Sequence, residues 1–209
     1  MAHATGVALT TNHLPDHSVD PLVIERCRQK DYEAFGKLVD AYQNRVFGFV
    51  RRMVPNAEDA AEVTQDVFVR AYQAFERFDG RCSVRTWLFR IAYNLCIDRS
   101  RKAGRSVKET SLSPQDEHDE PIDFADDRWQ PEQLVLDDEL RQHVEAAIAS
   151  MSEKLRSVLL LHDREDMAYD EIAEMLGLPL GTVKSRLFLA RAHLQNALRE
   201  YLRPEESHG

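Results

Sequence analysis

The stretch Gly181-Thr182-Val183-Lys184-Ser185-Arg186-Leu187 decides the fold of the C-terminal part of this 209-residue chain. It follows residues 169–177, whose apolar side chains recur with the spacing of one helical face. Gly177 suits a left-handed position at the end of a helix, because glycine has no Cβ. The two runs together predict a helix, a tight glycine turn and a second helix.

The second predicted helix has two contrasting faces. Apolar residues at spacings of three or four form a core stripe, namely Val183, Leu187, Ala190, Leu194 and Leu198. At about 100° per residue, the residues that point away from the stripe are Ser185, Phe188 and Leu189, with Thr182 near them. Three cations flank it, namely Lys184, Arg186 and Arg191. Because flanking cations can hold phosphates while outward residues meet base edges, the pattern indicates a DNA-binding helix-turn-helix. A plain helical hairpin with a solvated charged face is the alternative.

This string resembles region 4, the promoter-reading region of bacterial sigma factors, and is most similar to that of the extracytoplasmic-function group. The matching residues are Glu171-Ile172-Ala173, the stretch 181–187, Ala190 and Arg191. The chain departs from the family pattern at Ala168, Phe188 and Leu189, where a Ser or Thr cap, a small or polar residue and an Arg are usual. The resemblance implies that seven residues read the −35 element: Thr182, Lys184, Ser185, Arg186, Phe188, Leu189 and Arg191.

A longer helical block, residues 31–105, precedes this motif and has two short breaks. Its first apolar stripe is Phe35, Leu38, Val39, Tyr42, Val46, Phe49 and Met53. Asn56 can cap the next helix, whose inward residues are Ala60, Val63, Val67, Ala71 and Phe75. Asp59, Glu62 and Asp66 share another face of that helix, which is equally consistent with a solvated acidic surface and with a binding site.

A polar loop is predicted from Phe78 to Arg85, and a helix is predicted from Thr86 to Lys102. One face of this helix carries Trp87, Ile91 and Leu95, and another carries Arg90, Asn94 and Arg101. Aromatic rings beside Arg and Asn suit single-stranded DNA, because bases stack on rings and the backbone follows cations. An aromatic stripe at helical spacing is also typical of a core, so both readings of Trp87 stay open.

The block resembles sigma region 2. Its segment 55–75, with Glu58-Asp59-Ala60 and Gln65-Asp66-Val67-Phe68, resembles the polymerase-docking helix of the family. The resemblance implies polymerase-binding roles for Asp59, Glu62, Gln65 and Asp66. The loop 78–85 and the helix after it resemble the part that captures a flipped base, melts the promoter and reads the −10 element. The residues implied there are Phe78, Arg85, Trp87, Arg90, Asn94 and Arg101.

Charge and cysteine content limit the remaining possibilities. The net charge of −9 is spread unevenly, with +2 over residues 1–104, −6 over 105–136 and −5 over 137–209. No segment attracts phosphates strongly, so tight DNA binding without polymerase is not expected. Cys27, Cys82 and Cys96 lack the spacing of a zinc site or disulfide framework and are expected as free thiols in a reducing cytoplasm. We expect no signal peptide, no membrane insertion and no cofactor or metal.

The sequence therefore predicts an all-α protein of two small helical domains joined by a flexible acidic linker. The expected segments are a disordered extension at 1–20, region 2 at 21–105, the linker at 106–133, region 4 at 134–204 and a tail at 205–209. The expected function is promoter-specific transcription initiation without catalytic residues. The expected partners are the β′ clamp and β flap of core RNA polymerase, promoter DNA and an anti-sigma factor. Two rivals are a free-standing helix-turn-helix regulator and an enzyme that uses the Asp59, Glu62 and Asp66 face as a metal site.

Overall fold

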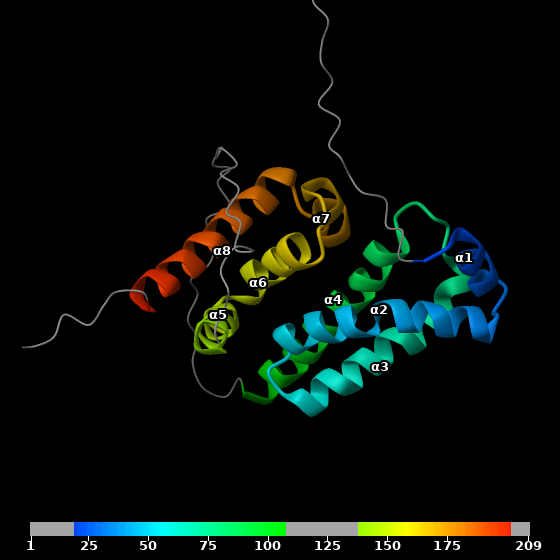
Figure 1. The fold of residues 1–209 in the computed structure, drawn as a ribbon, viewed down its shortest axis with the longest axis horizontal. Coiled ribbons are helices and arrows are strands. Elements are labelled where there is room, and N and C mark those ends of the chain that lie inside the picture. The colour runs from blue at the N-terminus through cyan, green and yellow to red at the C-terminus, as the bar shows by residue number, and fades with distance from the viewer. Residues whose placement is uncertain (1–18, 108–137, 202–209) are drawn as a thin grey trace, which may run out of the picture.

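The computed structural model describes residues 19–107 and 138–201, and these residues form two helical regions (Figure 1). The N-terminal region contains α1 (Pro21–Arg28), α2 (Tyr32–Met53), α3 (Ala57–Ala74), the 3₁₀ turn η1 (Phe75–Arg77) and α4 (Val84–Val107). The C-terminal region contains α5 (Asp138–Ser150), α6 (Glu153–Leu159), the π-helical segment η3 (Leu160–Arg164), α7 (Tyr169–Leu176) and α8 (Leu180–Tyr201). The predicted all-α class is confirmed. The predicted tail, residues 1–18 of the predicted extension and residues 108–133 of the predicted linker lie outside the described residues. Residues 106 and 107, predicted as linker, belong instead to α4.

Side-chain caps set where the helices of the N-terminal region begin. The carboxylates of Asp20 and Asp31 accept hydrogen bonds from the first-turn amides of α1 and α2. Asn56 Oδ1 accepts from the amides of Glu58 and Asp59, so the predicted cap of α3 is confirmed. Each such cap stabilises a helix by about 1 kcal/mol. Both predicted apolar stripes are covered, apart from a half-buried Val39, and α2, α3 and α4 pack through them.

The helix α4 begins earlier than the sequence predicts. The Ser83 hydroxyl accepts a hydrogen bond from the Thr86 amide at 3.0 Å, and the Ser83 carbonyl accepts from the Trp87 amide. Ser83 therefore caps the helix, and the loop ends there. The prediction that Arg85 belongs to the loop is wrong, because Arg85 lies in the first turn of α4.

The C-terminal region is a helix-turn-helix supported by two further helices. Gly177 has φ 66° and ends α7 in the left-handed conformation, as predicted. The whole predicted stripe of α8 is buried, and α8 packs on α5, α6 and α7. Ala168 offers no side-chain cap to α7, but Glu171 Oε2 accepts a hydrogen bond from the Ala168 amide at 3.1 Å. The family pattern usually has a Ser or Thr cap at this position. This chain lacks that cap and keeps only the hydrogen bond from the Ala168 amide to Glu171.

The two regions contact each other. The helix α7 lies against α4, and both α5 and α6 lie against α2 (Figure 1). Their buried apolar side chains belong to one continuous cluster. Within the described ranges, no helix is both long and apolar enough to cross a membrane.

Candidate nucleic-acid interface

The outward face of α8 presents the residues expected to read DNA. Lys184 is exposed, as are the two apolar side chains Phe188 and Leu189, at 43% and 51%. Ser185 and Arg186 are half-buried at the edge of this face. Thr182 departs from the prediction, because its side chain is buried at the start of α8 instead of standing beside the outward residues. The exposed face combines cations with apolar surface, which suits phosphates on one side and a thymine methyl on the other.

Arg191 is tied to its own region. Its Nη2 atom lies 2.8 Å from Asp163 Oδ1, and the same carboxylate oxygen lies 2.7 Å from His162 Nδ1. The ring of His162 stacks on Tyr169, with centroids 4.7 Å apart. Burial raises the pKa of the Asp163 carboxyl, but hydrogen bonds from His162 and Arg191 outweigh that effect and lower it. The position of Arg191 is therefore fixed by the half-buried carboxylate of Asp163 in η3, the segment that precedes α7.

Two residues expected at the −10 element form part of an aromatic cluster. Phe78 is buried, and its ring lies 5.5 Å from Phe75 and 5.2 Å from Trp87. Trp87, which is half-buried, also meets Phe75 edge to face at 5.2 Å. The guanidinium of Arg28 lies over the Phe78 ring. This geometry supports the core reading of Trp87 and holds Phe78 away from the exposed part of the loop.

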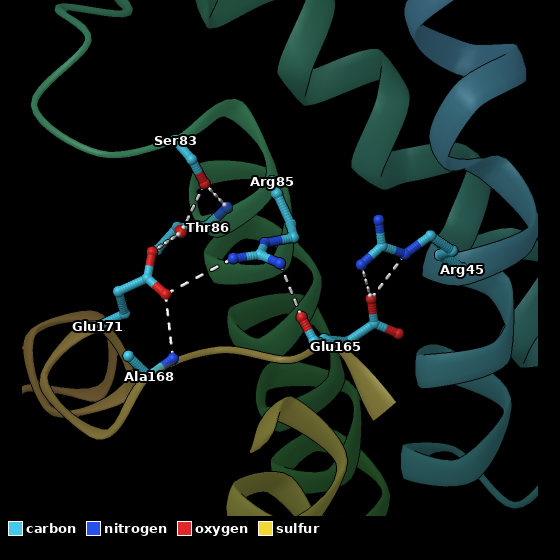
Figure 2. A network of polar contacts seen from close by, with 7 residues as sticks. All are labelled: Arg45, Ser83, Arg85, Thr86, Glu165, Ala168 and Glu171. Carbon is cyan, nitrogen blue, oxygen red and sulfur yellow. Dashed lines mark hydrogen bonds and ion pairs between the residues drawn. The ribbon is translucent and has the colours of Figure 1, made fainter. Parts of the chain in front are cut away.

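Arg85 lies between the two regions (Figure 2). Its side chain is 7% exposed, and its Nη1 atom donates to the backbone carbonyl of Glu165 at 2.9 Å. Its Nη2 atom lies 3.6 Å from the carboxylate of Glu171, which also accepts a hydrogen bond from the Thr86 hydroxyl. The family resemblance implies that Arg85 faces DNA, but in this structure it faces the C-terminal region.

The remaining residues expected on the −10 face differ in exposure. Asn94 and Arg101 are exposed along α4. Arg90 is half-buried, and its Nε atom is buried without a hydrogen-bond partner among the described residues. Of the six residues, Asn94 and Arg101 are thus the most accessible to a nucleic acid in this arrangement.

The acidic face of α3 is partly neutralised by a residue that the sequence pattern did not single out. Arg99 of α4 donates to Glu62 at 2.8 Å and forms a second ion pair with Asp59. Gln65 and Asp66 are exposed further along the same helix. The Arg99 guanidinium therefore occupies the place that a metal ion would take in the alternative hypothesis of an enzyme with a metal site on this face. The described ranges contain no group of three metal-ligating side chains.

Arg45, Arg99 and Glu165 were missed because their partners are far away in the chain. Arg45 and Glu165, which form an ion pair at 2.8 Å, are separated by 120 residues. Spacing along one helix reveals neighbours only three or four positions apart. Glu171 was noticed only as part of the family pattern, and no sequence signal pointed to its contact with Thr86.

Comparison with known families agrees with this two-part architecture. Residues 38–106 match sigma-70 region 2, and residues 141–194 match sigma-70 region 4. The RNA polymerase sigma-H factor of Pseudomonas aeruginosa is 35% identical over 88% of this chain and 96% of its own length. The ECF RNA polymerase sigma-E factor of Escherichia coli is 34% identical over 91% of this chain and 100% of its own length.

Solved structures show the same fold. CnrH in complex with the cytosolic domain of CnrY is similar with a TM-score of 0.61 and 26% identity, over 86% of this chain and 96% of CnrH. The sigma factor RpoE of Bartonella quintana, in complex with the anti-sigma factor NepR, has a TM-score of 0.62 at 23% identity, over 79% and 96% of the two chains. Together with the sequence matches, the described helices lead to one conclusion: this chain is a member of the extracytoplasmic-function group of the sigma-70 family, an RNA polymerase sigma factor that directs transcription initiation and has no enzymatic activity of its own.

Proposed function

We propose that this sigma factor docks on core RNA polymerase through the exposed acidic part of α3, which carries Gln65 and Asp66. The supporting observation is that these side chains remain exposed while Arg99 engages Asp59 and Glu62. Acidic surface suits a basic partner and speeds the encounter between them. The family resemblance makes the β′ clamp the partner of this helix and the β flap the partner of region 4.

Promoter reading divides between two helices in this proposal. Region 4 reads the −35 element with the outward face of α8, from which Lys184 and Arg186 reach DNA. Region 2 opens the strands and reads the −10 element with α4, where Asn94 offers both a donor and an acceptor to a base edge. The loop 78–83 receives the flipped base, and contacts there offset an extrusion cost of a few kcal/mol.

The net charge of −9 supports a division of labour with polymerase. Because an acidic protein gains little from the release of DNA counterions, polymerase delivers this chain to the promoter. Gel shifts with and without core polymerase separate this function from that of a free-standing regulator. A specific shift without core polymerase would favour the free-standing regulator. If a shift appears only with core polymerase, runoff transcription with start-site mapping would identify the promoter.

We also propose that the protein works in the cytoplasm and is held inactive by an anti-sigma factor. Support comes from two similar proteins: the sigma factor RpoE, which was solved with the anti-sigma factor NepR, and CnrH, which was solved with the cytosolic domain of CnrY. The exposed apolar side chains Phe188 and Leu189 give such a partner an apolar surface on α8. Co-purification of the chain from its native host, followed by identification of the bound protein, tests this part.

Docking is tested by the substitution Asp66→Lys. Asp66 is preferable to Glu62, because reversal of Glu62 would also repel Arg99. We expect Asp66→Lys to weaken core binding about tenfold or more, with little change in stability, since the side chain is exposed. Asp40→Lys on α2 makes the same change of charge at another exposed site and is the control. Unchanged affinity of Asp66→Lys in a quantitative pull-down would remove α3 from the interface.

A further inference from the structure

Two arginines of region 2 meet at one residue of region 4 (Figure 2). Arg45 of α2 donates from Nε to the carboxylate of Glu165 at 2.9 Å, and its Nη2 atom lies 2.8 Å from the same oxygen. Arg85 of α4 donates to the backbone carbonyl of Glu165. Region 2 therefore binds both the side-chain carboxylate and the backbone carbonyl of Glu165.

The backbone around Glu165 is irregular. The Glu165 amide donates to the carbonyl of Leu160, five residues back, which is the π-helical pattern of η3. Asp166 then has φ 51°, a left-handed conformation that residues other than glycine adopt rarely. Single π turns and strained residues occur often at functional positions. Here they turn the chain so that Glu165 projects toward α2 and α4.

Glu171 extends this contact over the first turn of α4. Its carboxylate accepts from the Thr86 hydroxyl at 3.2 Å and lies near Arg85. The same carboxylate caps its own helix through the Ala168 amide. The segment 165–171 of region 4 thus covers Arg85 and Thr86, which are both buried.

Further contacts hold the two regions together away from this segment. Arg52 of α2 forms a two-pronged ion pair with Glu145 of α5, at 2.9 and 2.5 Å. Arg156 of α6 donates to the backbone carbonyl of Arg52 at 3.2 Å. Ser100 of α4 donates to Glu153 at the start of α6. The regions are therefore joined along α2 and α4, and the covering of Arg85 is part of a larger interface.

The guanidinium of Arg85 is incompletely satisfied in this interface. Its Nε and Nη2 atoms are buried and have no hydrogen-bond partner among the described residues. Buried donors without partners destabilise the state that contains them. Arg85 would gain partners from DNA phosphates or bases when the regions separate. The unsatisfied donors of Arg85 thus weaken the closed arrangement at this residue, so that DNA can replace region 4 there.

From these contacts we infer that region 4 of the same chain covers the first turn of α4, the part of the strand-opening surface that carries Arg85, when the protein is free. Segment 165–171 covers Arg85 and Thr86, and it must leave before either residue touches promoter DNA. The importance of this covering for initiation rests on the proposed role of Arg85 at the −10 element. The closed arrangement itself can be measured without DNA or polymerase.

The ion pair of Arg52 with Glu145 offers a way to open the interface without changing any residue proposed to bind DNA. Arg52→Glu places two carboxylates together, Glu145→Arg places two guanidiniums together, and the double variant restores an opposite pair. Lys37→Glu, at an exposed position of the same α2 helix, is the control. Small-angle X-ray scattering of the full chain reports compactness, and amide hydrogen exchange of residues 84–90 reports the covering of Arg85.

We expect Arg52→Glu and Glu145→Arg each to enlarge the radius of gyration and to speed exchange at residues 84–90 about fivefold or more. The double variant should return both quantities toward those of the wild type, and Lys37→Glu should change neither. The inference is overturned if the wild-type scattering fits only separated regions, or if both single variants exchange like the wild type. A wild-type protein that closes as expected but supports no transcription with core polymerase would instead refute the proposed function.

Discussion

The two faces expected to read promoter DNA differ in what the fold leaves accessible. On α8, Lys184, Phe188 and Leu189 are exposed on one continuous side. On the −10 side, Phe78 is buried in an aromatic cluster and Arg85 is buried against the other region. Helical period marks Arg90, Asn94 and Arg101 as it marks the set on α8, whereas Phe78 and Arg85 are implied by the resemblance of their loop. The difference shows that period identifies a face, but that neighbouring elements decide which of its residues can reach a ligand.

The cause lies in the position of each helix. The helix α8 packs on α5, α6 and α7 through one stripe, which leaves its other side uncovered. The helix α4 packs on α2 and α3, and its first turns are also covered by α7 of region 4. Only its later residues, such as Asn94 and Arg101, are exposed. The −10 side is thus partly a core surface and partly a surface shared with region 4.

The largest effect should come from removing the ring of Trp87. Its packing against Phe75 and Phe78 predicts that Trp87→Ala lowers the free energy of unfolding of region 2 by about 3 kcal/mol. Asn94→Ala, on the exposed side of the same helix, should change stability by less than about 0.5 kcal/mol and yet impair promoter opening. Urea denaturation and permanganate footprinting on duplex and pre-melted templates separate the two effects. A Trp87→Ala protein as stable as the wild type would restore the base-platform reading of Trp87.

A smaller effect is expected on α8, where Arg186 and Lys184 test whether the exposed face reads bases. If Arg186 binds a base with two hydrogen bonds, Arg186→Ala should cost about 1–3 kcal/mol and relax preference at one −35 position. Lys184→Ala should weaken all −35 variants alike, because phosphate contacts carry no sequence information. Competitive transcription from a set of −35 variants measures both patterns. Wild-type output from the Arg186→Ala protein on every template would place −35 reading elsewhere.

The smallest effect concerns the pH dependence of the contact that Glu165 of region 4 makes with Arg45 and Arg85 of region 2. Burial raises the pKa of Glu165 to about 7, although Arg45 of α2 and Arg85 of α4 oppose the rise, and Asp166 adds to it. The Glu165 carboxyl therefore binds a proton more tightly in the closed state than in an open state where its pKa is ordinary. As a result, low pH favours the closed state, and the closed fraction falls as pH rises through 7. From pH 6 to pH 8 the ratio of closed to open protein should fall by up to about tenfold.

Hydrogen exchange of residues 84–90 across this pH range, corrected for the intrinsic exchange rate, measures the change in the closed fraction. Glu165→Gln keeps the size of the side chain but cannot titrate, so its closed fraction should be the same at pH 6 and pH 8. An equal pH dependence in wild type and Glu165→Gln would assign the effect to another group.

Local chemistry in the sequence predicted much of the fold. The cap Asn56 and the helix end at Gly177 were each recognised from one residue type at one position. Ser83 was overlooked, although a serine three residues before Thr86 is the same kind of signal. The α8 stripe was predicted completely, because it depends only on spacing.

Contacts between the regions could not be predicted in the same way. Thr86 and Glu171 are 85 residues apart, and no pattern along one helix links them. Their meeting depends on how whole regions pack, which is also why the burial of Arg85 was not foreseen. Residue types thus predicted which side chains suit DNA, whereas only the three-dimensional arrangement shows which of them are already engaged.

The bridge from Arg99 to Asp59 and Glu62 has a mechanical consequence. It links α3, the helix proposed to bind polymerase, to α4, the helix proposed to separate the DNA strands. Two helices joined by a packed core and by one guanidinium cannot slide along each other without breaking that bridge. A force applied by the enzyme at α3 is therefore transmitted to α4 as displacement of a rigid unit. Region 2 would then move as one rigid body that joins the proposed polymerase contact on α3 to the proposed strand-opening surface on α4.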